Sequence, residues 1–168
     1  GSTSAESYLD AAKVLDAARR SGADAVHPGY GFLSENADFA AAVESAGLVF
    51  IGPTAESIRL MGNKAAARRH MLAANVPCVP GYDGPDQADA AFHAAAQRIG
   101  YPVMVKAAAG GGGRGMRLVH EPQDLERALA AARSEARNAF GSDELILEQA
   151  LLRPRHVELQ VFADTQGN

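Results

Sequence analysis

Apolar positions in the first third of the chain alternate between helical and extended spacing. Between Ser7 and Ser21 they recur at about a 3.6-residue period, which predicts a helix that Gly22 ends. Short apolar runs at 23–26 and 48–52 flank a second predicted helix, Asn36 to Ala46. Strand, helix and strand in succession predict a βαβ unit with two parallel strands. The loops after these strands, HPGYG and GPTAES, are expected to meet where α/β proteins bind ligands.

The pattern changes at VPCVPGYDGP (76–85), where three prolines and two glycines predict a linker or domain boundary. Residues 54–75, before it, are predicted to be helical. After it, the pattern predicts helices at 86–99 and 122–140, and strands at 101–106, 116–119, 144–148 and 156–162. Helix, hairpin, helix and strand in this order describe a small α+β module.

Composition and charge exclude several classes of protein. With 47% hydrophobic and 21% charged residues, the chain has a globular composition. A net charge of -4 with scattered arginines argues against a nucleic-acid partner. No apolar run approaches the roughly 18 residues of a membrane helix, so no membrane partner is expected. The single cysteine cannot close an internal disulfide, which favours a reducing compartment.

The stretch KAAAGGGGRGM, from Lys106 to Met116, contains the most specific chemistry in the pattern. It satisfies G-x-G-x-x-G literally, but the residues that follow have a strand pattern, whereas the dinucleotide motif requires a helix there. It also lacks the G-K-[ST] ending of a P-loop. The remaining interpretation is a hairpin whose glycine tip brings backbone N–H groups close to phosphate oxygens, with Lys106 adding a point charge. A plain connector between two strands is the alternative.

Six ordered segments together resemble biotin carboxylase, the ATP-grasp component of biotin-dependent acyl-CoA and pyruvate carboxylases. They are HPGYGFLSEN (27–36), FIGP (50–53), RLMGNK (59–64), VPCVPG (76–81), IGYPVMVKAAAGGGGRGM (99–116) and PRHVELQV (154–161). The resemblance implies an α/β fold with four parts. These are part of a Rossmann-like (pre-ATP-grasp) βαβ domain at 1–52, a helical connector with the first ATP lysine at 53–78, an α+β ATP-grasp lid subdomain at 79–150, and the start of a C-terminal ATP-grasp domain at 151–168.

The resemblance also implies roles for individual residues. In that family ATP phosphorylates bicarbonate, carboxyphosphate releases CO2, and a carrier-bound biotin is carboxylated. Lys64 and Lys106 match the lysines that contact ATP phosphates. The other implied ATP-binding residues are Gly111, Gly112 and Gly113 of the flap, Met116, Glu148, Gln149 and Leu151 around the adenine, and His156 near the ribose and phosphates. Tyr30 and Gly31 match positions of the biotin pocket.

Each of these assignments has an ordinary structural alternative when taken singly. Lysines are usually solvated, Glu148 could be a strand-end charge, His156 a surface residue and Tyr30 a core residue. The family often has Glu-Lys where this sequence has Glu148 and Gln149, a departure that leaves backbone contacts intact.

The resemblance implies ATP, Mg2+, bicarbonate as substrate, and biotin on a carrier domain. The Mg2+ ligands are expected beyond Asn168, because no acidic pair within the sequence replaces them, and no catalytic residue is assigned within it. Expected partners are the biotin carboxyl carrier, a carboxyltransferase subunit or domain, and a second copy in a homodimer. The expected location is the cytoplasm, or the mitochondrial matrix in a eukaryote.

Two other functions stay open at this point. The chain, expected to be an internal fragment, is on its own a nucleotide-binding or merely folded lid without turnover. The parent protein is otherwise another ATP-grasp ligase, such as a carbamoyl-phosphate synthetase, which shares the lysines and the glycine flap. HPGYGFLSEN favours the carboxylases, since its tyrosine loop belongs to them.

Replacing Gly112 and Gly113 with valine in the full enzyme is expected to weaken ATP use well beyond about tenfold. The added Cβ atoms would hold the backbone away from the phosphates. The dependence of turnover on ATP concentration measures the effect, and unchanged kinetics would reduce the loop to a connector.

Overall fold

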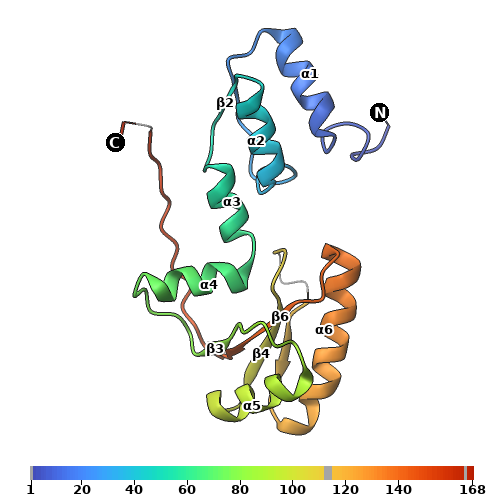
Figure 1. Ribbon diagram of the computed structural model, residues 1–168, viewed down its shortest axis with the longest axis vertical. Helices are drawn as coiled ribbons and strands as arrows, with labels where there is room; N and C mark the ends of the chain where they lie inside the picture. Colours follow the sequence, from blue (N-terminus) through green and yellow to red (C-terminus); the bar gives the residue numbers. More distant parts are fainter. Residues whose placement is uncertain (1, 112–114, 165) are drawn as a thin grey trace.

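The computed structural model describes residues 2–111, 115–164 and 166–168, which form two groups of elements and an extended final segment (Figure 1). The helices are α1 (Ala11–Ser21), α2 (Ala37–Ser45), α3 (Ala55–Met61), α4 (Lys64–Ala73), α5 (Asp89–Ile99), the 3-10 turn η1 (Pro122–Asp124) and α6 (Leu125–Phe140). The strands are β1 (Ala25–Val26), β2 (Val49–Phe50), β3 (Gly81–Tyr82), β4 (Val103–Ala107), β5 (Arg117–Val119) and β6 (Leu145–Gln149).

The first group is the predicted βαβ unit. β1 and β2 pair in parallel, with Ala25 opposite Val49, as the sequence pattern predicted. The cap of α1 is also as predicted, because Gly22 has the left-handed backbone with φ 68° that ends a helix without steric cost. An apolar cluster joins α1, α2, β2 and α3: Leu15, Leu33, Phe39, Ala40, Val43, Phe50 and Ile58.

The second group is an antiparallel sheet in the order β3-β6-β4-β5, packed against α5 and α6 (Figure 1). The predicted hairpin is confirmed, since β4 and β5 pair antiparallel. Along β4, Val103, Val105 and Ala107 are buried in the core with the helices. The alternate side chains, Met104 and Lys106, therefore point to the opposite face, which α5 and α6 leave uncovered.

The helix α4 connects the two groups and is anchored to the second. Asn63 caps it by accepting a 2.8 Å hydrogen bond from the Ala66 N–H. The Lys64 N–H donates to the carbonyl of Ala108, just after β4, over 2.8 Å. Ala65 packs in a small buried cluster with Ala108 and Ile146. The start of α4 is thus bound to the strands that carry the glycine loop.

The predicted strand at 156–162 is wrong. The segment is extended but belongs to no strand, and Val157, Leu159 and Val161 are 70 to 86% exposed. A strand needs a neighbour for its backbone N–H and C=O groups, and none of the described residues pairs with this segment. Its alternating sequence pattern is that of a strand, but among the described residues it has no neighbouring strand to pair with.

The stretch read as a linker at 76–85 contains the short strand β3, which the pattern missed. Gly81 lies opposite Glu148 of β6, where a Cβ on Gly81 would come within 2.6 Å of the Leu147 carbonyl oxygen. Glycine therefore permits this close approach. The signal was hidden because both residues sit among prolines and glycines.

Candidate functional site

Five of the predicted ATP-binding residues line one cavity of about 280 Å³ on the uncovered side of the sheet. They are Lys106, Met116, Glu148, Gln149 and Leu151, and the rest of the lining is Val79, Met104, Ala150 and Pro154. Met104 could have been found from the sequence, because it lies two residues before Lys106 on the same face of the strand. Val79, Ala150 and Pro154 give no such signal.

Lys106 and Glu148 form an ion pair within this cavity. Glu148 of β6 lies opposite Met104, and Lys106 lies opposite Ile146, so the two charged side chains are diagonal neighbours on one face. They are mostly buried, with 25% and 19% of the side chains exposed. Register thus places a cation and an anion side by side in the lining of the cavity.

Lys64 approaches the same region from α4. Its ammonium donates a hydrogen bond to the carbonyl of Gly110, at the stem of the glycine loop. Burial, and secondly the charge of Lys106, lower the pKa of Lys64 below its usual value of 10.5, while Glu148 and Glu35 oppose the shift. Two ammonium groups therefore act on each other beside the loop, and Glu35 of the HPGYGFLSEN segment also acts on Lys64 through its charge.

The position of Lys64 on its helix adds to the positive potential. Lys64 is the first residue of α4, and the first turn of α4 contains no acidic residue. The amino end of a helix carries a partial positive charge, so a lysine there is electrostatically unfavourable without an anion. Gly111 lies at the adjoining stem, whereas the predicted Gly112 and Gly113 lie outside the described residues. The arrangement favours a polyanion between α4 and β4.

Besides Lys64 and Gly111, which lie at the stem of the glycine loop, three further predicted residues that the structure describes do not line this cavity. His156 lies on the extended segment with its side chain 86% exposed, 3.1 Å from a carboxylate oxygen of Glu158. Tyr30 and Gly31 lie in the loop after β1, and Tyr30 is 99% exposed, which excludes the alternative of a core tyrosine. The His27 and Tyr30 rings meet edge to face with centroids 5.8 Å apart. Tyr30 is thus available to a ligand or a partner.

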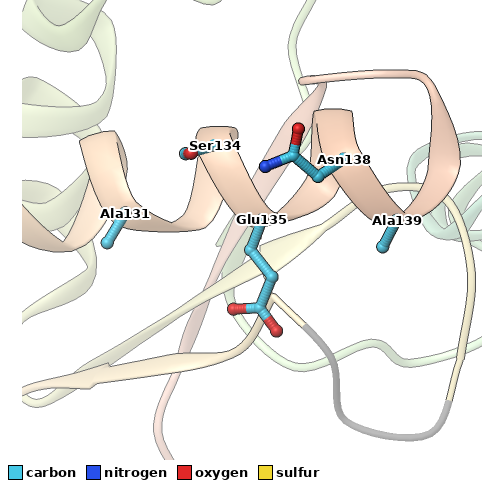
Figure 2. A pocket seen from close by; sticks show the side chains of 5 residues that line it. All are labelled: Ala131, Ser134, Glu135, Asn138 and Ala139. Atoms are coloured by element: carbon cyan, nitrogen blue, oxygen red, sulfur yellow. The ribbon is translucent and has the colours of Figure 1, made fainter.

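A larger hollow of about 670 Å³ lies along α6 and is lined by residues of that helix alone, as Figure 2 shows. Glu135, one of its lining residues, holds Arg117 of β5 through a 2.7 Å ion pair. None of the predicted site residues contributes to it. The smaller cavity, which gathers the predicted residues, is therefore the candidate site.

The described residues show neither a metal-binding cluster nor a membrane-spanning helix. Within 2–111, 115–164 and 166–168, no group of three or more His, Cys, Asp and Glu side chains is arranged to hold a metal ion. In the same part of the chain, no helix has the length and apolarity needed to cross a bilayer.

Comparison with known families agrees with this geometry. Residues 63–168 match the family described as "Carbamoyl-phosphate synthase L chain, ATP binding domain", and residues 1–58 match "Biotin carboxylase, N-terminal domain". The sheet and the helices that pack on it fit an ATP-binding domain of the ATP-grasp class. The chain belongs to this family of ATP-binding domains, in the form that follows a biotin carboxylase N-terminal domain.

Relatives of known identity confirm the resemblance to biotin carboxylase. The biotin carboxylase of Haemophilus influenzae is 56% identical over 166 residues, which are 98% of this chain and 37% of the relative. The mitochondrial methylcrotonoyl-CoA carboxylase subunit alpha of Glycine max is 54% identical over 162 residues, 96% of this chain and 22% of the relative. The chain thus spans little more than a third, at most, of these two proteins.

A solved structure shows the same fold. It is the biotin carboxylase domain dimer of 2-oxoglutarate carboxylase from Hydrogenobacter thermophilus, in complex with MgADP, ADP and bicarbonate. It aligns with a TM-score of 0.82 and 46% identity over 86% of this chain and 32% of that chain. The expected α/β fold of a biotin carboxylase ATP-grasp protein is therefore confirmed.

The lowered pKa of Lys64 predicts how nucleotide binding depends on pH. Only the charged ammonium attracts phosphate, so MgATP affinity is expected to fall as pH rises through the lowered pKa of Lys64, before an ordinary lysine titrates. In Lys64→Arg the guanidinium keeps its charge, and the loss is expected at higher pH. Dissociation constants measured from neutral to alkaline pH give both profiles, and profiles of identical shape would contradict this role of Lys64.

Proposed function

We propose that the whole protein to which this chain belongs is a biotin carboxylase, which uses MgATP and bicarbonate to carboxylate a carrier-bound biotin. One observation carries the proposal: Lys64 of α4 and Lys106 of β4 act on each other beside the stem of the glycine loop, next to the cavity. Two cations supplied by separate elements suit phosphoryl transfer, in which catalysis is largely positioning and charge neutralisation. The MgADP and bicarbonate bound by the Hydrogenobacter relative support the choice of substrates.

The cavity residues divide into apolar and polar parts that suit a nucleotide. Met104, Met116 and Leu151 offer apolar surface for the faces of a purine, while Glu148 and Gln149 offer polar groups for its edge. Lys106 stands between this lining and the glycine stem. We infer that the adenine occupies the cavity and that the phosphates extend toward Lys64, Gly110 and Gly111.

Nucleotide binding requires Lys106 to exchange partners, at least in part. In the described state its charge is neutralised by Glu148. A triphosphate brings more negative charge than one carboxylate, so it competes effectively for the ammonium. Glu148 therefore keeps a mostly buried lysine paired until the phosphates arrive.

The proposed reaction requires Mg2+, but we assign none of the described residues as its ligands. Mg2+ prefers octahedral oxygen ligands, and when bound it neutralises charge on the phosphates. Following the resemblance to biotin carboxylase, we assign its ligands to other parts of the whole protein. The chain alone is then a nucleotide-binding unit without turnover.

The exposed Tyr30 and Gly31 are the proposed biotin side of the site. Glu35, on the same segment, acts on Lys64 through its charge, which links this loop to the phosphate end. The proposed partners are a biotin carboxyl carrier domain, a carboxyltransferase, and a second copy, as in the dimeric Hydrogenobacter domain. The proposed location is the cytoplasm or, as for the soybean relative, the mitochondrion.

The whole protein is expected to hydrolyse ATP in a reaction stimulated by free biotin and bicarbonate. Lys106→Gln removes a charge from the phosphates and is expected to lower turnover by about a hundredfold. Lys13→Gln is the matched control, because Lys13 lies on α1 with its side chain 57% exposed and is expected to be silent. Release of inorganic phosphate is the measurement.

Two results would contradict the proposal. Stimulation by glutamine or ammonia instead of biotin would point to a carbamoyl-phosphate synthetase. A normal rate in Lys106→Gln would remove Lys106 from the mechanism.

A further inference from the structure

The side chain of Asn63 makes two hydrogen bonds to different parts of the fold. Its Oδ1 accepts from the Ala66 N–H over 2.8 Å, as a helix cap. Its Nδ2 donates to a carboxylate oxygen of Glu144 over 3.2 Å, across 81 residues of sequence. The cap needs the amide oxygen, so the amide nitrogen necessarily faces the other way, toward the carboxylate. The two contacts are therefore mutually consistent.

Glu144 belongs to the same backbone network as the two site lysines. Its carbonyl accepts from the Ala108 N–H over 2.9 Å, and the Ala108 carbonyl accepts from the Lys64 N–H over 2.8 Å. Asn63 itself forms an isolated antiparallel β-bridge with Ala109. The contact between Asn63 and Glu144 thus closes a ring that contains the start of α4, the end of β4 and the residue that precedes β6.

The structure assigns to Asn63 the role of a positioning residue that sets where Lys64 stands relative to Lys106 and the glycine loop. This inference rests on the proposed function, because it concerns the phosphate end of that site. Lys64 and Lys106 come from different elements, so their joint contact with the phosphates depends on how α4 is held against the sheet. Asn63 itself stays one residue away from the proposed phosphate contacts.

Capping alone does not require asparagine. Aspartate and serine cap helices about equally well, and aspartate also suits the positive end of the helix. Of asparagine and aspartate, only asparagine supplies a donor toward Glu144, through its amide. The hydrogen bond to Glu144, called the tie below, is therefore the contact that distinguishes asparagine from aspartate at this position. Mutation can separate this contact from the helix cap.

The experiment is a double-mutant cycle in the whole protein, with the KM for ATP and kcat measured in the presence of biotin and bicarbonate. Asn63→Asp keeps the cap but sets two carboxylates against each other, and is expected to raise the KM for ATP about tenfold with kcat at saturating ATP little changed. Glu144→Gln is the matched control, since its side-chain oxygen still accepts from Asn63 and the KM is expected to stay near wild type. In the double variant the new glutamine amide donates to the new aspartate, and the KM is expected to return toward wild type.

Rescue separates a positioning role from a merely structural one. A wild-type KM in Asn63→Asp would overturn the proposal. So would a double variant that regains the denaturation midpoint of the wild type but keeps the raised KM.

Failure of the proposed function would be recognised separately. If the wild-type protein hydrolyses no ATP with biotin and bicarbonate, that function is wrong, and the tie is judged from urea unfolding of the same four proteins. Asn63→Asp is then expected to lower the unfolding midpoint and Glu144→Gln to restore it. Absence of coupling between the two positions in unfolding would overturn the tie.

Discussion

The candidate site depends on how the start of α4 is held against the sheet. The Lys64 N–H donates to the Ala108 carbonyl, and Ala65 packs on Ala108 and Ile146. These contacts fix the helix at the point where β4 leads into the glycine loop. A lysine at the first helical residue then necessarily stands beside that loop. If this contact were absent, Lys64 and Lys106 would be cations on two unrelated elements.

The electrostatic balance at this point favours an incoming anion. Lys64 is partly buried, stands at the positive end of α4 and is repelled by Lys106. Glu148, which is paired with Lys106, and Glu35 partly offset this repulsion. Two ammonium groups held near each other beside the glycine stem are suited to binding a negatively charged triphosphate.

Local patterns were enough to predict the elements that carry the site. The strand pattern after the glycines distinguished the hairpin from a dinucleotide-binding turn, and alternation placed Lys106 on the preceding strand. The individual roles of the site residues came from the family resemblance. The cavity lining agrees with the grouping of Lys106, Met116, Glu148 and two neighbours, whereas His156 lies away from it.

Features that depend on distant partners were beyond local patterns. The segment 156–162 has a strand pattern but no partner among the described residues, whereas β3 has a partner but no strand pattern. The tie from Asn63 to Glu144 spans 81 residues, and its two members have no distinguishing sequence signal. Pairing and side-chain contacts of this kind are set by the fold as a whole.

Calorimetric titration with MgATP tests the central claim most directly, using the chain, the Lys13→Gln control and the double variant Lys64→Gln/Lys106→Gln. Saturable binding is expected for the wild type and the control. Binding to the double variant is expected to be more than about tenfold weaker, because each substitution removes a charged contact with the phosphates. Equal binding by the double variant, or no binding by the folded wild type, would contradict the claim that these two lysines form a phosphate site.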